Sequence, residues 1–351
     1  MATKQHCSTI TRLQTNKISY IDSNAFSGLI KLQSLGLSRS YPLKLYSKSK
    51  LASSGRKATV IHSLDLTNNF LLEIRHLEFG DCRTLFVRNN KLKKLDFIRS
   101  LSQLIVVSLT SNRITFVNVQ DFAKLTSLKE LHLQHNQISE LYPILKGLQN
   151  IRILNLNSNR IEDIAKIFNV TLPYLSQFDL SNNKVTLSDQ DELGLTFLEN
   201  LNLAGNKITY LNCSGLPPVL RSLNLAYNNI LEFDGNCDRL FYQVTKIDMS
   251  YTNLIANGID VQKDFLDKLN LVNDLDVSDN PIILNTFVRD LYERVGPFLI
   301  GIHLNKCNIS AIPEKAFAFD YLRVLSLNGN NLREFDMFDV SGNDLNLITE
   351  L

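Results

Sequence analysis

The sequence lacks an excess of charge of either sign. Its 37 Lys and Arg residues are nearly balanced by 35 Asp and Glu residues, so the formal net charge is +2. Proteins that bind nucleic acid or an anionic membrane through their overall charge carry a larger basic excess. We therefore expect neither nucleic acid nor a charged membrane surface as a partner.

Long apolar segments are also missing. The apolar runs Leu104–Leu109 and Phe298–Leu304 are far shorter than the roughly 20 residues that cross a bilayer. Met1–Ser8 is polar and offers no apolar core for a secretory signal. The sequence therefore predicts no membrane span, and it belongs either to a cytosolic protein or to a fragment of a longer one.

The common catalytic motifs are absent as well. There is no G-x-S-x-G, no phosphate-binding glycine loop, no H-E-x-x-H and no C-x-x-C. His132 and His135 lie three residues apart, but the sequence suggests no third metal ligand beside them, so two surface histidines are the simpler interpretation. We predict no catalytic, cofactor-binding or metal-binding residues, and hence no enzyme.

What the sequence does contain is a repeated frame of nine positions, seen most clearly in Leu128–Asn136 (LKELHLQHN). Leucines occupy positions 1, 4 and 6, and an asparagine occupies position 9. The same frame returns in Ile151–Asn159, Leu198–Asn206 and Leu322–Asn330. Recurrence at a fixed spacing is the sequence signature of a repeat architecture.

The spacing has a physical explanation. Positions 4 and 6 are two residues apart, as a strand requires if both side chains are to enter one core. The asparagine comes where the chain leaves the strand, and its amide can satisfy buried backbone groups of its own coil and of the next. Since one coil cannot bury its apolar side alone, the coils must stack into a solenoid with one parallel sheet.

Position 9 gives a ruler for the whole chain. The frames are centred on Asn16, Ser40, Asn69, Asn90, Asn112, Asn136, Asn159, Asn183, Asn206, Asn228, Thr252, Asn280, Cys307 and Asn330. The sequence therefore predicts about 14 coils, spanning residues 8–335, in a single domain 1–351 that is a piece of a longer protein.

Departures from the ruler predict loops and helices. The basic, Ser-rich segment 41–57 should leave the solenoid, either as a solvated insertion or as a contact for an acidic partner. Apolar residues recur at helical spacing in 260–271 and 286–295, which predicts short helices on the outer side of the coil. Residues 336–351 are too few for another coil, so we expect an irregular end.

These residues resemble the leucine-rich repeat superfamily over about 10–335. Phe26, Phe79, Phe122 and Phe317 each follow position 9 by ten residues, which resembles the outer side of the extracellular class found in Toll-type receptor ectodomains and secreted arthropod immune proteins. The resemblance implies an α/β solenoid: a horseshoe with a concave parallel sheet, and with loops, 3-10 turns and short helices on its convex side. Other copies look more like the shorter intracellular class.

Five cysteines and three sequons bear on the compartment. Cys82 and Cys307 occupy frame positions and are interpreted as core substitutions. Cys213 and Cys237 follow the strands of neighbouring repeats, so they form either a disulfide or two unrelated thiols. The sequons, which would fit secretion, begin at Asn169, Asn212 and Asn308.

The outward face of the sheet is the candidate binding surface, because a rigid face binds with little ordering cost. Position 5 forms a polar column there, rich in Asp and Asn. Aromatic and Arg side chains are the commonest interface anchors. The predicted ligand-binding residues are Phe86, Arg88, His132, Gln134, Asn155, Asp179, Tyr227, Asp248, Tyr251 and Asp276. The alternative is that these are ordinary exposed strand residues.

The sequence thus predicts a non-enzymatic recognition module that binds a protein or a microbial surface ligand on the concave face or an edge. An innate-immune or cell-surface protein, extracellular and glycosylated, is the favoured class. The alternative is a cytoplasmic adaptor or scaffold of the same fold, such as a phosphatase regulator. The oligomeric state is not predicted.

Overall fold

The computed structural model describes most of the repeat frames. The described residues are 10–16, 33–39, 61–74, 81–140, 142–162, 164, 172–188, 195–211, 213, 215–233, 243–253, 269, 271–282, 287, 291, 298–313 and 315–334. The predicted loop 41–57 and the predicted irregular end 336–351 lie outside them. The predicted outer helices also lie outside the described residues, apart from two residues of each. Residues 269 and 271 belong to the first predicted helix. Phe287 and Leu291 belong to the second, and these two are helical and fully buried.

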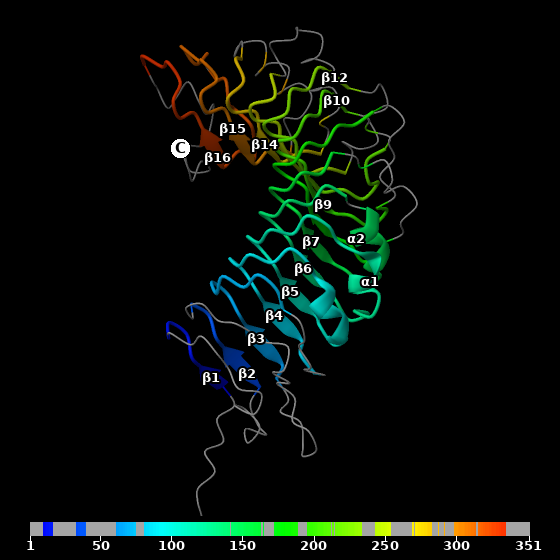
Figure 1. Ribbon diagram of the computed structural model, residues 1–351. Helices are drawn as coiled ribbons and strands as arrows, with labels where there is room; N and C mark the ends of the chain where they lie inside the picture. The colour runs from blue at the N-terminus through cyan, green and yellow to red at the C-terminus, as the bar shows by residue number, and fades with distance from the viewer. Residues whose placement is uncertain are drawn as a thin grey trace, which may run out of the picture. The chain divides into compact units, whose positions relative to one another are not determined.

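The chain divides into two compact units, unit 1 (Met1–Phe178) and unit 2 (Asp179–Leu351). That all of 1–351 forms a single domain stays a prediction. Each unit is a parallel β-solenoid, in which every turn adds one short strand to a sheet (Figure 1). The predicted fold class is confirmed in both units.

The strands of each unit pair in sequence order, and all the pairs are parallel. Unit 1 contains β1 (Ile10–Arg12), β2 (Ser34–Gly36), β3 (Ser63–Asp65), β4 (Thr84–Phe86), β5 (Val106–Ser108), β6 (Glu130–His132) and β7 (Ile153–Asn155). Unit 2 contains β9 (Asn200–Asn202), β11 (Ser222–Asn224), β13 (Lys246–Asp248), β14 (Asp274–Asp276), β15 (Gly301–His303) and β16 (Val324–Ser326). Strand β8 (Gln177–Asp179) crosses the division, and β10 (Tyr210–Leu211) pairs separately with β12 (Glu232–Phe233).

Each strand of the main sheet occupies positions 3–5 of a predicted frame. The frame and its register are therefore correct. The number of complete coils, predicted as 14, stays a prediction because the chain between several strands lies outside the described residues.

The core lies behind the sheet. From β3 to β16 the side chain at position 4 is buried, and from Leu66 to Leu304 so is the one at position 6, including the fully buried Leu203. Burying one such side chain contributes about 1.5–3 kcal/mol. Cys82 and Cys307 are free and fully buried, which confirms them as core substitutions.

Short helices cover the other side of the core in unit 1 (Figure 1). They are η1 (Asp96–Ser100), α1 (Val119–Phe122) and α2 (Tyr142–Gly147), and α1 packs against both of the others. Helix α1 begins with a capping box, in which Asn118 accepts from the Gln120 N–H and Asp121 accepts from the Asn118 N–H. In the described copies of the phenylalanine column, Phe122 and Phe317 are buried.

The asparagines at position 9 tie each coil to a neighbour. The Asn112 amide donates to Leu109 O in its own coil and to Val87 O in the preceding coil, both at 2.9 Å. Its Oδ1 accepts from Leu92 N of the preceding coil at 3.0 Å. The predicted link exists, but it runs to the preceding coil and not to the next. The side-chain amide points back across the turn, toward the end of the strand in the preceding coil.

Position 8 is the point at which the chain turns sharply off the strand. Every residue described there has a positive φ between 51° and 70°, and only two of them are glycines, Gly205 and Gly329. A side chain at such a position costs roughly 1–2 kcal/mol, least for Asn and Asp and most for bulky residues. Large side chains nevertheless occupy position 8 in several coils, among them Arg39, His135 and Lys306.

Candidate functional site

The sequence predicts a polar binding column at position 5, and in the structure most of its Asp and Asn side chains hydrogen-bond to the turn that follows the strand. The Oδ1 atom of Asp179 accepts from Ser181 N at 2.9 Å, and that of Asp248 accepts from Ser250 N at 3.0 Å. The same bond to the N–H two residues later is made by Asp65, Asn155, Asn202, Asn224 and Asp276. These side chains hold the turn that leaves the strand, which explains why Asp and Asn are enriched in the column.

In unit 1, strands β4 to β6 and the turns after them carry four predicted residues, of which Phe86, Arg88 and His132 interact. The Arg88 guanidinium lies 5.2 Å from the centre of the Phe86 ring and donates from Nε to Ser108 Oγ at 2.8 Å. Gln134 occupies position 7 two coils further on, and its Oε1 is buried without a hydrogen-bond partner among the described residues. A buried, unpaired oxygen is costly, so rotation of the Gln134 side chain toward solvent, where its oxygen could meet a donor, would relieve this cost.

His132 is the fourth of these residues. Burial lowers the pKa of His132, and the nearby Arg88 lowers it further, although Glu130 opposes both effects. The imidazole is therefore neutral at physiological pH and can accept or donate one hydrogen bond. His135 does not join it, and no group of three metal-ligating side chains occurs among the described residues.

In unit 2, Tyr227 and Tyr251 form an exposed aromatic pair. Their ring centres lie 5.1 Å apart with planes inclined by 29°, and 59% and 56% of the two side chains remain exposed. Both occupy position 8 of adjacent coils, with φ of 55°. The sequence had placed them on adjacent coils, and the structure adds that each tyrosine holds a strained backbone conformation without contributing to the core.

A charged row crosses the same face of unit 2, and sequence reasoning missed its central residue, Asp274. Lys246 Nζ lies 2.5 Å from Asp274 Oδ2, and His303 Nε2 lies 3.3 Å from Asp274 Oδ1. His303 Nδ1 is 3.0 Å from Ser326 Oγ. These residues lie at positions 3 and 5 of four consecutive strands, so strand register alone could have found the row. Gly301 leaves the space in which Asp274 and His303 meet.

The contacts in this row set its protonation. The His303 hydrogen bond, aided by Lys246, lowers the pKa of Asp274 to about 2. The same hydrogen bond is the largest influence on His303 and raises its pKa. Beside the row, burial raises the pKa of Asp248, and the nearby Asp276 carboxylate adds to the effect.

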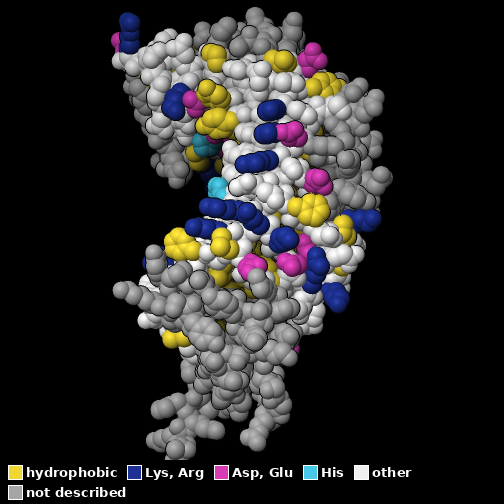
Figure 2. Space-filling model, in the orientation of Figure 1, with side chains coloured by type: hydrophobic (Ala, Val, Ile, Leu, Met, Phe, Trp, Pro, Cys, Tyr) yellow, Lys and Arg dark blue, Asp and Glu magenta, His cyan; other side chains and the backbone are white. Residues whose placement is uncertain are grey.

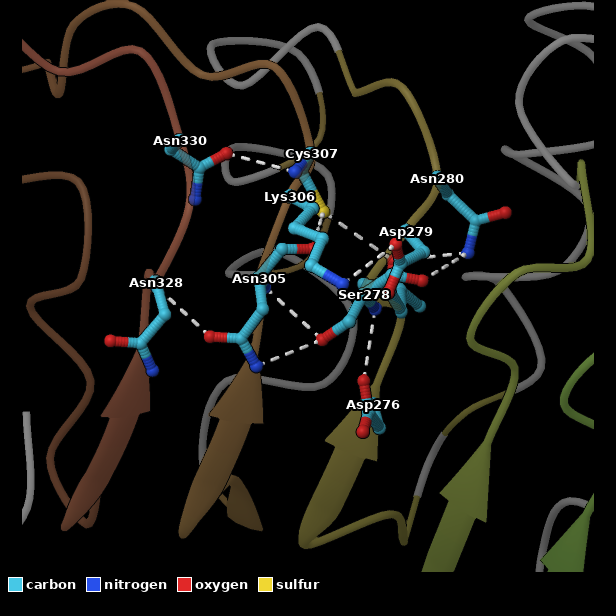
Figure 3. A network of polar contacts seen from close by, with 10 residues as sticks. Asp276, Ser278, Asp279, Asn280, Asn305, Lys306, Cys307, Asn328 and Asn330 are labelled. Atoms are coloured by element: carbon cyan, nitrogen blue, oxygen red, sulfur yellow. Dashed lines mark hydrogen bonds and ion pairs between the residues drawn. The ribbon is translucent and has the colours of Figure 1, made fainter.

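Next to the row, polar side chains link the turns of successive coils (Figure 3). Ser278 Oγ accepts from both the backbone N–H and the side-chain amide of Asn305, each at 3.1 Å. Asn305 Oδ1 accepts in turn from Asn328 N at 2.9 Å, and Lys306 lies 3.6 Å from Asp279. This network joins the turns that follow β14, β15 and β16. Figure 2 shows charges of both signs interspersed on the surface that it displays.

The predicted covalent sites are only partly described. Cys213 takes part in a disulfide, and the proposed partner Cys237 lies outside the described residues, so that pairing stays a prediction. The sequons at Asn169 and Asn212 also lie outside them. Asn308 is exposed, and its Oδ1 accepts from the Asn331 amide at 2.6 Å. No helix among the described residues is long and apolar enough to cross a membrane.

Two family models match this sequence: leucine-rich repeat over residues 82–138, and leucine-rich repeats (2 copies) over 126–169. Lumican from Mus musculus is 27% identical over 180 residues, covering 50% of this chain and 52% of lumican. Podocan from Mus musculus is 26% identical over 331 residues, covering 86% of this chain and 52% of podocan. The chain thus spans about half the length of these relatives.

Among solved structures, the TLR13–ssRNA13 complex aligns with a TM-score of 0.61 and 20% identity, covering 97% of this chain and 48% of TLR13. At this identity the likeness supports the fold alone. Because TLR13 is in complex with an RNA, a protein of this fold can bind nucleic acid. The near-neutral charge therefore gives too little ground to exclude nucleic acid for this chain, and that exclusion is not supported.

Proposed function

We propose, from the premise that this chain belongs to the leucine-rich repeat superfamily, that it is a recognition module of an extracellular or cell-surface protein with a role in innate immunity. Its partner is a protein or a microbial surface ligand, which binds the exposed sheet face and the adjoining turn edge. The observation that carries the proposal is the stacked pair Tyr227–Tyr251.

This pair has the properties of an interface anchor. Aromatic rings supply large contact area with few rotatable bonds, and tyrosine is enriched among the residues that dominate binding energy. The backbone beneath the rings is fixed, because Tyr227 N donates to Ser250 O and Tyr251 N donates to Ser278 O, each at 2.9 Å. The rings are thus held in place before a partner arrives, which lowers the ordering cost of binding.

The strain supports the same conclusion. Asn or Gly would occupy position 8 more comfortably than Tyr, and other coils do carry Asn68, Asn89 and Asn182 there. Two adjacent tyrosines therefore cost the fold stability without filling its core. Retention of such residues is expected where the exposed rings serve binding.

Electrostatics indicates the kind of partner. Asp248 lies at position 5 of the coil that carries Tyr251, and the next coil carries Asp276 at position 5 and Asp279 at position 8. A partner with a Lys or Arg side chain would meet both an aromatic face and carboxylates, and the charges would speed its approach. In unit 1, the Phe86–Arg88 cluster with Gln134 is a second candidate contact for the same class of partner.

The proposed compartment is supported by Cys213. Disulfides persist in oxidising compartments and are rare in the cytosol, so a bonded Cys213 favours the extracellular alternative over the cytoplasmic one. The exposed sequon at Asn308 is accessible to glycosylation. Expression of the full-length gene in animal cells, followed by enzymatic glycan removal, should shift the mobility of the wild-type protein, and Asn308→Gln should reduce that shift. A wild-type protein without glycan would contradict the proposed compartment.

The binding proposal is tested by replacing the rings with the residue that the backbone prefers. Tyr227→Asn and Tyr251→Asn, singly and together, should leave the unfolding midpoint at or above that of the wild type, because Asn tolerates positive φ. Immobilised wild-type chain would be screened against purified extracellular proteins and microbial surface preparations by surface plasmon resonance. Each ligand found would then be measured on the variants.

We expect the double variant to weaken binding at least tenfold, since hot-spot aromatics contribute about 2 kcal/mol or more. His135→Asn, the same kind of substitution at position 8 in unit 1, is the matched control and should change neither folding nor binding. If the ligands bind the double variant as tightly as the wild type, the tyrosine pair is not the recognition site.

A further inference from the structure

A row of exposed apolar side chains runs along the edge of unit 2 at which the strands begin. The residue immediately before position 1, here called position 0, carries Phe197, Val219, Leu271, Phe298 and Tyr321. Between 39% and 60% of each side chain is exposed, although each precedes a buried core residue. Ile300, at position 2 of the coil of Phe298, is 42% exposed and lies beside the row. We call these six residues the apolar stripe.

The stripe residues lie on successive hydrogen-bonded coils in two groups, Phe197 with Val219, and Leu271 with Phe298 and Tyr321. At position 2, Arg221 N donates to Glu199 O, and Thr245 N donates to Arg221 O. The same bond is repeated in the next three coils, up to Arg323 N and Ile300 O. With adjacent strands about 4.8 Å apart, the stripe extends roughly 24 Å from Phe197 to Tyr321. Only the coil of the exposed Gln243 interrupts it.

The frame does not require apolar residues at position 0. Among the described residues of unit 1, the same position carries Asp81, Gln103, Ser127 and Asn150, followed by an exposed tyrosine, Tyr174. Polar side chains are thus compatible with this edge of the solenoid. The apolar character in unit 2 is a property of that surface and not of the fold, and exposed apolar rows of this kind mark interaction sites.

We propose that the apolar stripe is a homodimer interface, in which a second copy of this chain packs its own stripe against the first in antiparallel orientation. The size fits. The three aromatic side chains expose on the order of 300 Å², and the aliphatic residues bring the total to roughly 500 Å². A standard interface buries about 800 Å² per partner, somewhat more than half of it apolar. The stripe therefore supplies the apolar part, and the polar residues at position 2 supply the rim.

The distribution of charge identifies the second copy as the occupant. Exposed Glu199 lies beside one end of the stripe and exposed Arg323 beside the other, while Thr245 and Asn273 at its centre are uncharged. The exposed Arg221, one coil in from Glu199, is the other charged residue of this row, and the antiparallel arrangement sets it opposite Ile300. A twofold axis between the coils of Gln243 and Leu271 places Glu199 of each copy opposite Arg323 of the other. The same axis brings Phe197 opposite Tyr321. A surface that is complementary to itself under a twofold rotation is the requirement for a closed dimer.

The test measures the association of the full chain by sedimentation velocity across a concentration series through the micromolar range. The wild type should dimerise, and Phe298→Ser should weaken the dimer at least tenfold, because the ring lies inside the row, one coil from its end, and would lose its buried contact. Phe116→Ser, a matched change of an exposed phenylalanine in unit 1, should leave the dimer constant unchanged. Circular dichroism checks that each variant is folded.

A charge exchange tests the antiparallel arrangement. Glu199→Arg and Arg323→Glu should each weaken the dimer, since each places like charges together across the interface, and the double variant should restore it to within a few fold of the wild type. A wild-type chain that stays monomeric, or a dimer unaffected by Phe298→Ser, would overturn the proposal. A double variant weaker than both single ones would overturn the twofold arrangement. Because the tyrosine pair lies on the opposite edge, failure here leaves the proposed recognition site untouched.

Discussion

Replacing the buried Asn112 tests directly how the coils are held together. In the structure its amide donates to Val87 O and Leu109 O, which belong to two different coils, and at 3.4 Å also to Thr110 O, and it accepts one hydrogen bond from Leu92 N. The residue is 7% exposed, so water cannot replace these bonds easily. Asn112→Ala removes all of these bonds, while Asn112→Asp keeps an acceptor for Leu92 N and removes the two N–H donors of the amide.

The expected cost depends on which groups keep another partner. Val87 O still accepts from the Asn90 amide at 3.2 Å, and Leu109 O still accepts from the Asn136 amide at 3.1 Å. The amide of Leu92 has no such second acceptor in the described contacts, so it bears the full desolvation penalty of about 1–3 kcal/mol. Val87 O and Leu109 O each lose one of their hydrogen bonds and add to this penalty. The free energy of unfolding should therefore fall by about 2–4 kcal/mol in Asn112→Ala.

Asn112→Asp should behave differently with pH. At neutral pH its carboxylate faces two carbonyl oxygens in a buried site, so it should destabilise unit 1 more than alanine does. Burial and repulsion raise the pKa of such a carboxyl group, so the protonated form is favoured in the folded state. The stability of Asn112→Asp relative to Asn112→Ala should therefore improve as the pH falls.

Native-state hydrogen exchange at the Leu92 amide is the suitable assay, because a chain with two compact units need not unfold in one transition. In Asn112→Ala, the free energy of opening at the Leu92 amide should fall by about 2–4 kcal/mol. Gln149→Ala, at an exposed helix end, is the control and should change it by less than about 0.5 kcal/mol. If Leu92 kept its protection in Asn112→Ala, or if the Ala and Asp variants exchanged alike at all pH values, the asparagine bonds would not be what ties the coils.

Two further predictions concern stability. Leu203→Ala, which empties a fully buried position in the core of unit 2, should lower the free energy of unfolding by about 2–5 kcal/mol in urea denaturation, and an unchanged midpoint would mean that the frame is misplaced. The Asp274–His303 pair should stabilise unit 2 most between about pH 4 and pH 6. The contribution of Asp274 is lost as the pH falls toward its folded pKa of about 2, and that of His303 is lost as the pH rises through its raised pKa. The urea midpoint of His303→Gln, compared with the wild type at pH 5 and pH 8, should show a larger deficit at pH 5, and a deficit independent of pH would contradict the assignment.

The candidate site was only partly predictable. Phe86 with Arg88 and Tyr227 with Tyr251 could be paired from the frame alone, because side chains two positions apart on one strand, or at equal positions on adjacent coils, must be neighbours. Asp274 was missed because only position 5 was followed across the strands, and the partner of His303 lies at position 3. The bonds from position 5 to the turn could have been inferred from the Asx preference of such turns.

The sequence by itself determined the solenoid, its strands and their register. A leucine frame that recurs along the chain has one way to bury all its apolar side chains, and the asparagines fix where each turn occurs. Only the tertiary structure decided the strain at Tyr227 and Tyr251, the direction of the asparagine links and the exposure of the apolar stripe. These features depend on which side chains meet across coils and which remain in water. A pattern read within one coil contains no information about either.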